Sequence, residues 1–442
     1  MKFTKLETRL TGCNSCGDRI YQEDAFTVSL NKTKDDKEQD PNWEYLFIGV
    51  FDGHGGHEAS KFAKEHLEQN ITSNRLFWSD RDKDVLKAIR EGFLQTHNAM
   101  WKAQENWPRT HAGFYSTAGT TASIAFIKNG KLFVGHVGDS KIVLGMEHDH
   151  HENWISKELT IDHKPESPEE RKRIMESGGK VVAKAGVPRV VWNRPKAGQK
   201  GRQLRNTKTD EIPFLAIARS LGDLWSYNSQ TGQFVVSPDP DLRVYNLVPG
   251  KHKCLIFGTD GLWNVMSAQS AVQMVSNSHY SSRVRKHDWK NPSKTLVDEA
   301  IKRWAIAEKR ADNVSVVTLI LTDDEDMDED EEEEEESEES EIYTYESDPE
   351  ECIYTAEYYE KKDSNVQFLQ HEDTSLYESI PYQHDDTNFT PEYEDISHMA
   401  VDEDCETLKR VKNNGSGIFP KCVMRQYQST STTFERFNYI ES

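Results

Sequence analysis

The sequence predicts an α+β sandwich followed by a long acidic tail, and three observations lead to this fold class. Residues 1–322 contain several short, continuously apolar runs, which are typical of strands buried on both faces. Few helical stretches separate these runs, and this favours a sandwich over a doubly wound parallel sheet. The acidic residues gather beyond residue 322, where they are too dense to surround a packed core.

Charge divides the chain at the same boundary. The 442 residues include 54 basic and 76 acidic side chains, a net charge of −22. Residues 323–442 carry 8 basic and 37 acidic side chains, and residues 1–322 carry 46 and 39. From 323 to 341, 16 of 19 residues are Asp or Glu, a block that repels itself. We therefore predict a folded domain over 1–322 and a largely disordered tail over 323–442, in which short docking segments remain an alternative.

Composition also bounds the class of protein. No stretch reaches the roughly 18 consecutive apolar residues that a transmembrane helix needs, so we expect no membrane contact. The first residues lack the apolar core of a signal peptide. Six cysteines in so long a chain do not form a disulfide framework. We expect a monomer in a reducing compartment, the nucleus or the cytoplasm.

The elements follow from local patterns. Helical periodicity covers residues 59–67 and continues at Val85, Ile89, Phe93 and Met100. The expected strands, all continuously apolar, cover residues 45–51, 122–127, 132–137, 142–144, 254–257 and 314–321.

Two further helices have start signals. Ser167 precedes Pro168, and Glu170 stands three residues after the serine, which predicts an N-cap with a capping box. Gly178 and the glycine after it end that helix. Asn291 followed by proline starts the last helix of the folded domain.

Aspartates recur where apolar runs end. Asp52, Asp139 and Asp260 each follow such a run, and Asp312 comes just before the last one. An aspartate at a buried strand end is costly unless a cation meets its charge, and oxygen donors favour Mg²⁺ or Mn²⁺ over zinc. Gly53 leaves its carbonyl open to an ion, and Asp52 has two oxygens with which to bridge two ions. For one aspartate alone a turn is the commoner explanation, so the recurrence carries the prediction.

Eight ordered motifs over about residues 8–322 resemble those of the type 2C metal-dependent serine/threonine protein phosphatases. They are Arg19 with Glu23-Asp24, Asp52-Gly53-His54-Gly55-Gly56, Thr117-Ala118-Gly119-Thr120-Thr121-Ala122, Val137-Gly138-Asp139-Ser140, Asp162-His163-Lys164-Pro165, Ala218-Arg219-Ser220-Leu221-Gly222-Asp223, Asp260-Gly261-Leu262-Trp263 and Asp312-Asn313. The resemblance implies a central β-sandwich of two antiparallel sheets flanked by helices, in α-β-β-α layers, with a dinuclear site at one end.

The resemblance also implies the metal ligands. Asp52 would bridge two Mg²⁺ or Mn²⁺ ions, and Asp260 and Asp312 would hold one of them. Glu23 and the Gly53 carbonyl would complete the shell of the other, and Asp24 in the same motif is a further candidate metal-site residue. Asp139 matches the position of a weaker third ion.

The implied reaction is in-line attack of metal-activated water on phosphoserine or phosphothreonine. Arg19 would clamp the phosphate with its planar fork, and His54 would protonate the leaving oxygen. Asn264 stands where many members have an aspartate, which puts a third-metal role at that position in question. His57 is an alternative acid, although a solvated histidine at a helix start is the preferred interpretation.

A basic loop at about 184–211 holds eight Lys or Arg between 184 and 208 and no acid there. It is similar to the delta (Wip-type) members, which implies substrates from DNA-damage and stress-kinase signalling. Acidic or doubly phosphorylated peptides suit such a loop, and an inert solvated loop is the alternative. The candidate substrate-binding residues are Arg19, Arg189, Arg194, Lys196, Lys200, Arg202 and Arg205.

Two alternatives to the phosphatase are open. A catalytically silent scaffold that binds phosphoproteins is expected to have lost a central carboxylate, whereas Asp52, Asp260 and Asp312 are all present. A nucleic-acid-binding protein is disfavoured because a single basic loop offers only a small positively charged surface, so we expect no nucleic acid partner. The acidic segment 323–341 is a candidate intramolecular partner of the basic loop, with a solubilising role as the alternative.

Overall fold

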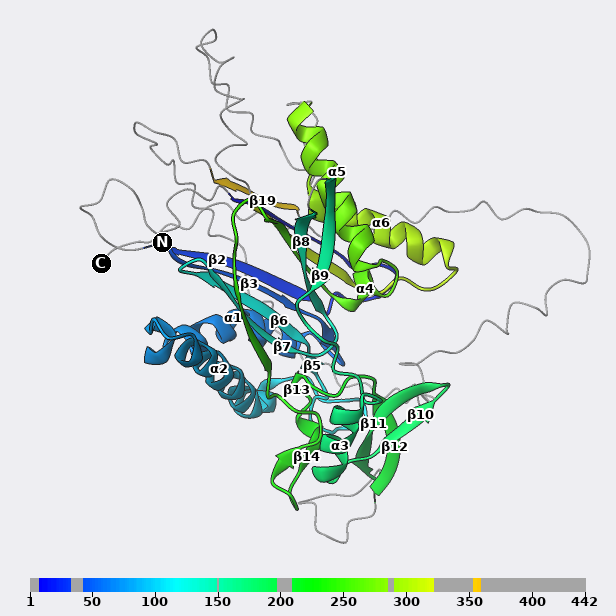
Figure 1. Cartoon of the computed structure of the whole chain (residues 1–442). Helices are drawn as coiled ribbons and strands as arrows, with labels where there is room; N and C mark the ends of the chain where they lie inside the picture. Colours follow the sequence, from blue (N-terminus) through cyan, green and yellow to red (C-terminus); the bar gives the residue numbers. More distant parts are fainter. Residues whose placement is uncertain are drawn as a thin grey trace, which may run out of the picture. The chain divides into compact units, whose positions relative to one another are not determined.

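The computed structural model describes residues 8–32, 43–148, 151–196, 209–284, 290–321 and 353–358. These residues belong to one compact unit. Two antiparallel β-sheets pack face to face, and pairs of helices cover their outer faces (Figure 1). The predicted sandwich of four layers is confirmed.

The first sheet has five strands in the order β16-β7-β6-β3-β2. Helices α1 (Glu58–Thr72) and α2 (Asp82–Ala103) cover it, and both are blue in Figure 1. Its strands are β2 (Ala25–Lys32), β3 (Trp43–Phe51), β6 (Ala122–Lys128), β7 (Lys131–Val137) and β16 (Asp241–Asn246).

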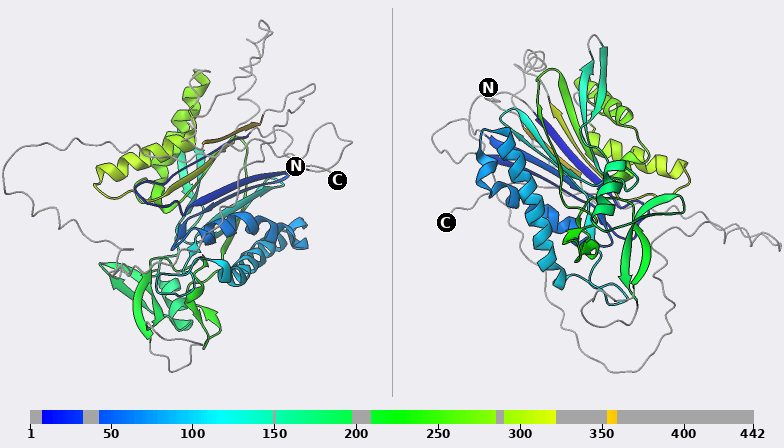
Figure 2. Two further views of the ribbon diagram at one scale, coloured as in Figure 1. Left: turned by 180° about the vertical axis from the view of Figure 1, so that it is seen from behind. Right: turned by 60° about the horizontal axis from the view of Figure 1, so that its bottom comes forward.

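The second sheet has six strands in the order β19-β1-β18-β17-β8-β9. Helices α5 (Ala268–Val284) and α6 (Pro292–Ile306) lie against its outer face, as both views of Figure 2 show. Its strands are β1 (Thr8–Ser15), β8 (Lys141–His148), β9 (His151–Glu158), β17 (His252–Gly258), β18 (Val314–Leu321) and β19 (Ile353–Tyr358).

The core explains why the strands are apolar without interruption. Ile48 and Leu319 belong to the cluster between the two sheets, whereas Phe47 belongs to the cluster under α1 and α2. Val316 and Trp154 join the cluster under α5 and α6. Central strands therefore bury both faces, and all eight residues of β18 are buried.

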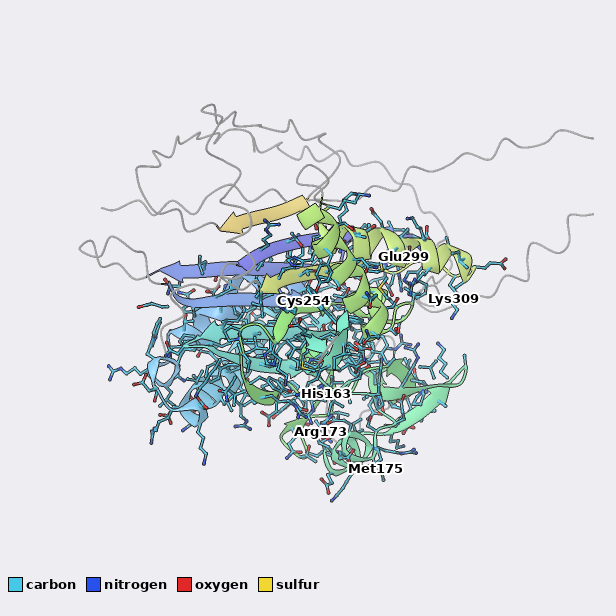
Figure 3. All side chains as sticks on the ribbon, turned by 45° about the horizontal axis from the view of Figure 1, so that its top comes forward. His163, Arg173, Met175, Cys254, Glu299 and Lys309 are labelled. Carbon is cyan, nitrogen blue, oxygen red and sulfur yellow. The ribbon has the colours of Figure 1, made fainter. Side chains whose placement is uncertain are left out.

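A smaller three-stranded sheet, here called the side sheet, consists of β10 (Val181–Lys184), β11 (Val187–Pro195) and β12 (Thr209–Leu215). Helix α3 (Pro168–Glu176) precedes it. Arg173 of α3 donates to the carbonyl of Ala218, whose N–H donates to the carbonyl of His163 (Figure 3 labels Arg173 and His163). These bonds tie α3 and the side sheet to the loop that follows β9.

Short elements complete the described part of the chain. The sheet β13-β5-β4 and the hairpin β14-β15 connect the larger units. Their bounds are β4 (Gly53–His54), β5 (Gly119–Thr120), β13 (Leu221–Gly222), β14 (Tyr227–Asn228), β15 (Gln233–Phe234), α4 (Asp260–Trp263), η1 (Arg75–Trp78), η2 (Gln104–Asn106) and η3 (Leu224–Ser226).

The predicted strands and helices are confirmed, but the capping box is wrong. Ser167 is the N-cap of α3, yet its side chain makes no capping hydrogen bond. Glu170 instead accepts from Arg173 Nε at 2.9 Å and from Arg219 Nε at 2.8 Å. Two arginines offer a buried carboxylate stronger, charge-assisted bonds than one backbone N–H does.

The predicted tail, 323–442, lies outside the described residues except for β19. This strand pairs antiparallel with β1, with Ile353 opposite Cys13 and Tyr358 opposite Thr8. The sequence leaves short docking segments in the tail open, and the structure pairs residues 353–358 with β1. Among the helices of the described residues, none carries an apolar stretch long enough to cross a bilayer.

Candidate active site

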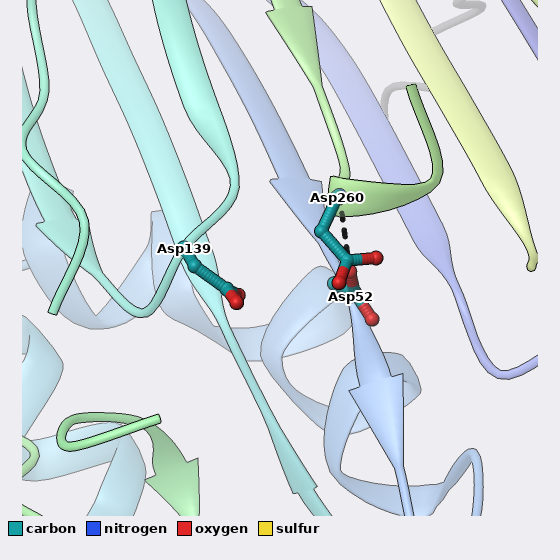
Figure 4. Close-up of side chains that lie close together, drawn as sticks. All are labelled: Asp52, Asp139 and Asp260. Carbon is teal, nitrogen blue, oxygen red and sulfur yellow. Dashed lines mark hydrogen bonds between the residues drawn. The ribbon is translucent and has the colours of Figure 1, made fainter. Parts of the chain in front are cut away.

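Three aspartates meet at one end of the sandwich because the strands that carry them end there. Asp52 follows β3 and Asp139 follows β7 in one sheet, and Asp260 follows β17 in the other. One carboxylate oxygen from each lies within 4.8 Å of the other two (Figure 4). The N–H of Asp260 also donates to Asp52 Oδ2 at 3.3 Å. The site therefore spans both sheets.

The electrostatics of this group call for a cation. Burial raises the pKa of Asp52 well above its ordinary value, and the charges of Asp24 and Asp260 raise it further. Burial, with Asp139 and Asp312 nearby, raises the pKa of Asp260 to about 7. Carboxylates this close cannot all ionise by themselves, whereas a divalent cation would favour their charged forms. The donor set, oxygen alone, fits Mg²⁺ or Mn²⁺.

Asp24 lies behind the group. Its Oδ2 accepts from Thr259 Oγ1 at 2.9 Å, and its buried Oδ1 has no hydrogen-bond partner among the described residues. Burial raises its pKa to about 8. An orphaned carboxylate oxygen beside the aspartate group is a further sign that the site suits a cation with its waters.

Glu23 is held beside Gly53 by close backbone packing. A side chain at Gly53 would place its Cβ 2.2 Å from the carbonyl oxygen of Glu23, so only glycine fits here. Glu23 Oε1 accepts from the N–H of Gly56 at 2.7 Å, and its own N–H donates to Asn313 Oδ1 at 2.8 Å. These contacts bring Glu23 next to the Asp52-Gly53 turn, where the resemblance puts the second ion.

Asn264 contacts the group, and Asp312 lies near enough for its charge to act on Asp260. Asp312 Oδ2 lies 2.7 Å from Arg19 Nη2, and the Arg19 side chain is 48% exposed. Asp312 is thus paired with the arginine and is not one of the three grouped aspartates. Asn264 Nδ2 donates to Asp260 Oδ2 at 3.1 Å, so the residue that departs from the family pattern still contacts a predicted ligand. Asp139 forms an ion pair with Lys164.

His54 points its ring at Asp223, for which the sequence predicts no role. Its Nε2 lies 2.7 Å from Oδ2 of the buried Asp223. Burial alone would lower the pKa of His54, but Asp223, with Glu23 and Asp139, raises it above its ordinary value. The two residues are 169 positions apart in the chain. The one local sign of a role for Asp223 is that it ends the family motif at residues 218–223. His57 is the N-cap of α1, as predicted.

The described basic residues of the loop are mostly engaged. Arg189 Nη1 donates to the carbonyl of Phe214 at 2.8 Å, and the Arg194 guanidinium lies 6.0 Å from the Trp192 ring centre. Lys196 Nζ lies 3.5 Å from Asp210 Oδ1. The candidate residues Lys200, Arg202 and Arg205 lie outside the described part of the chain.

Comparison with known proteins agrees with this geometry. The family model of protein phosphatase 2C matches residues 8–314. This chain belongs to the protein phosphatase 2C family. It is 30% identical over 307 residues to a probable protein phosphatase 2C of Arabidopsis thaliana, covering 69% of this chain and 68% of that protein. It is also 30% identical to protein phosphatase 2C homolog 2 of Hypocrea jecorina, covering 59% of this chain and 50% of that protein.

Solved structures show the same fold. A serine-threonine phosphatase 2C of Toxoplasma gondii aligns with TM-score 0.57 at 25% identity, over 72% of this chain and 96% of that one. A C. elegans sex determining protein aligns with TM-score 0.52 at 23% identity, over 70% of this chain and 64% of that one, and supports the fold alone. The chain spans about half to two thirds of the length of the curated relatives it matches. The family consists of metal-dependent serine/threonine phosphatases, and the delta-type subgroup stays a prediction.

Proposed function

We propose that this chain is a protein phosphatase that hydrolyses phosphoserine and phosphothreonine with divalent cations. The observation that carries the proposal is the convergence of Asp52, Asp139 and Asp260 within 4.8 Å at one end of the sandwich, in a chain of this family. A pocket of acidic oxygens beside an exposed arginine and a histidine suits a phosphate monoester whose charge is met by cations.

The carboxylates define where the cations would sit. Asp52 and Asp260 would hold them, with Asp312 near Asp260 on one side and Glu23 and the Gly53 carbonyl on the side nearest the turn. Two ions, Mg²⁺ or Mn²⁺, fit this set of donors, and Asp139 with Lys164 beside it suits a weaker third. When bound, such ions polarise the phosphoryl group and generate a strong nucleophile from water near neutral pH.

Arg19 orients the substrate. Its guanidinium offers a planar fork that matches two phosphate oxygens, and the contact with Asp312 fixes one side of that fork. About half of the Arg19 side chain is exposed, so an incoming phosphate has access to it.

His54 handles the proton of the departing group. A serine or threonine oxygen is a poor leaving group as an alkoxide, so a proton delivered as the P–O bond breaks lowers the barrier. The neighbouring Asp223 carboxylate favours the protonated ring, which is the form that can donate. His57, at the N-cap of α1, makes no such pairing in the described part of the chain and is the weaker candidate.

The substrates we propose are delta-type: proteins of DNA-damage and stress-kinase signalling, in the nucleus or cytoplasm. The support is the basic loop, with Arg194 and Lys196 at the end of β11, because cationic side chains pair well with a second phosphate. We also propose an electrostatic contact between the acidic segment 323–341 and this basic loop, because their charges are opposite. We also propose that the chain acts as a monomer.

The phosphatase is tested by phosphate release from phosphoserine and phosphothreonine peptides, with Mn²⁺ or with a chelator. We expect release only with the metal, and its loss in Asp52→Asn. Asp298→Asn on α6, an exposed aspartate paired with Lys294 and outside the aspartate group, is the matched control and should behave as wild type. Release that survives chelation would refute the proposal, and absence of release under every condition would favour the silent scaffold.

A further inference from the structure

The carboxylate of Asp223 is a buried hub for three side chains. It accepts from His54 Nε2 at 2.7 Å and from Ser220 Oγ at 2.5 Å through one oxygen, and from Trp225 Nε1 at 2.7 Å through the other. Its side chain has no exposed surface. A buried carboxylate with this many donors is held in one geometry, and it holds its partners in turn.

The backbone around the hub is adapted to it. Asp223 has φ of +48°, a left-handed conformation that is costly for a residue other than glycine. Its N–H donates to the carbonyl of Ala118 at 3.0 Å. A side chain at Gly119 would place its Cβ 2.1 Å from Asp223 Oδ2 and 2.4 Å from His54 Nε2. A strained residue and a required glycine therefore both serve the contact between Asp223 and His54.

This contact assigns different tasks to the two ring nitrogens. Because Nε2 faces a carboxylate, it keeps its proton and donates it there. His54 Nδ1 has no hydrogen bond to a side chain or backbone group in the ranges that the structure describes. The ring is thus left with Nδ1 to serve the substrate.

We propose that Asp223 is a positioning residue that fixes the tautomer and orientation of His54, so that Nδ1 delivers the proton to the leaving oxygen. This inference rests on the proposed phosphatase function. As the phosphorus–oxygen bond to serine breaks, its electron pair stays on the serine oxygen, which takes the Nδ1 proton. The attacking water supplies the new oxygen of the released phosphate and loses one proton to solvent. His54 ends neutral, with its Nε2 proton still donated to Asp223, and solvent later returns a proton to His54 Nδ1.

Trp225 links this hub to the side sheet. Its ring lies 5.8 Å from the Trp192 ring of β11 and 5.1 Å from the Phe214 ring of β12, between centres. The Phe114 ring also packs against Trp192, at 6.1 Å between ring centres. The N–H that Asp223 receives from Trp225 is therefore placed by the packing of the side sheet, so Trp225 is a second positioning residue, one step further from the substrate.

The test uses two substrates that differ in their need for a proton. The serine oxygen of a phosphoserine peptide leaves as an alkoxide unless it is protonated, whereas p-nitrophenyl phosphate releases p-nitrophenolate, which is a stable anion. For Asp223→Asn, which keeps the shape but not the charge, we expect kcat on the peptide to fall about 10²-fold or more, and kcat on p-nitrophenyl phosphate to fall less than about threefold. Equal losses on both substrates would show a merely structural role and overturn the inference.

Trp225→Phe and Ser220→Ala each remove one hydrogen bond to Asp223 and keep the charge. We expect each variant to lose roughly 3- to 10-fold in kcat on the phosphoserine peptide and nothing on p-nitrophenyl phosphate. If Asp223→Asn does not fold, these two variants test the role of Asp223. Trp78→Phe is the matched control, because the Trp78 indole donates to the Thr72 carbonyl far from the site. A loss in the control equal to that in Trp225→Phe would contradict the proposal.

The proposed phosphatase function and the role of Asp223 can be refuted separately. If the wild-type chain releases no phosphate from either substrate, the proposed function fails. If the wild type is active on both and the Asp223, Trp225 and Ser220 variants lose nothing specific to the peptide, only the role of Asp223 fails.

Discussion

The end of the sandwich and the side sheet differ in how they use charge. At the sandwich end, carboxylates of like charge are crowded together at the ends of buried strands, and burial with the neighbouring carboxylates raises the pKa values of Asp52 and Asp260. On the side sheet, Arg189 and Arg194 lie on β11 and are engaged by a carbonyl and an aromatic ring. The carboxylates at the sandwich end therefore require cations to balance their charge, whereas the side-sheet arginines already have partners. Chemistry should therefore depend steeply on the first region and recognition only mildly on the second.

The largest effect is expected at the sandwich end. Asp260→Asn removes one of three grouped charges, and we expect kcat on a phosphothreonine peptide to fall about 10³-fold, equivalent to about 4 kcal/mol. The control Asp298→Asn should keep wild-type kcat. A loss below tenfold would mean that the crowded carboxylates are not where the reaction occurs.

A buried group outside both regions gives a contrast. Burial lowers the pKa of His97 on α2 to about 4, so it stays neutral near pH 7 in the folded state. The unfolded chain binds this proton more readily, so stability falls as the pH drops from about 6.5 toward 4.

We expect His97 to contribute about 2 kcal/mol to the loss of unfolding free energy between pH 7 and pH 5. Denaturant unfolding of wild type and His97→Leu at pH 7 and pH 5 measures this contribution, as the difference between the two proteins in how much unfolding free energy is lost. Parallel pH dependence in the two proteins would contradict a buried neutral His97.

Arg19 is expected to have an intermediate effect. Arg19→Lys keeps the charge but loses the planar fork, so KM for a phosphopeptide should rise about tenfold. Arg90→Lys is the control, because Arg90 makes a two-point contact with Asp239 elsewhere on the surface, at 2.6 and 2.9 Å. A rise in KM that is equal in both variants would argue against a phosphate clamp at Arg19.

The side sheet should show the smallest effect. Changing Arg194 and Lys196 together to Gln should raise KM for a doubly phosphorylated peptide about 3- to 5-fold, and less for a singly phosphorylated one. The exposed pair Lys83 and Lys102 on α2, changed in the same way, controls for net charge. Equal changes on both peptides would favour the inert loop.

Much of the candidate site could be predicted from the sequence, because buried strands require continuous apolar runs that are visible locally. Continuous apolar runs predicted strands such as β3 and β18, and the aspartates at their ends predicted where the pocket forms. The contact between His54 and Asp223 left no such trace, since it joins β4 to a residue 169 positions later and depends on the positive φ of Asp223. Glu170 was misassigned for a similar reason, because the distant Arg219 competes with the local cap.

The central claim is that the grouped aspartates hold divalent cations, and calorimetric titration of Mn²⁺ into the full chain tests it without reference to turnover. We predict that wild type and Asp298→Asn bind Mn²⁺ alike, and that Asp52→Asn binds fewer ions or binds them at least about tenfold more weakly. Identical isotherms for wild type and Asp52→Asn would contradict it.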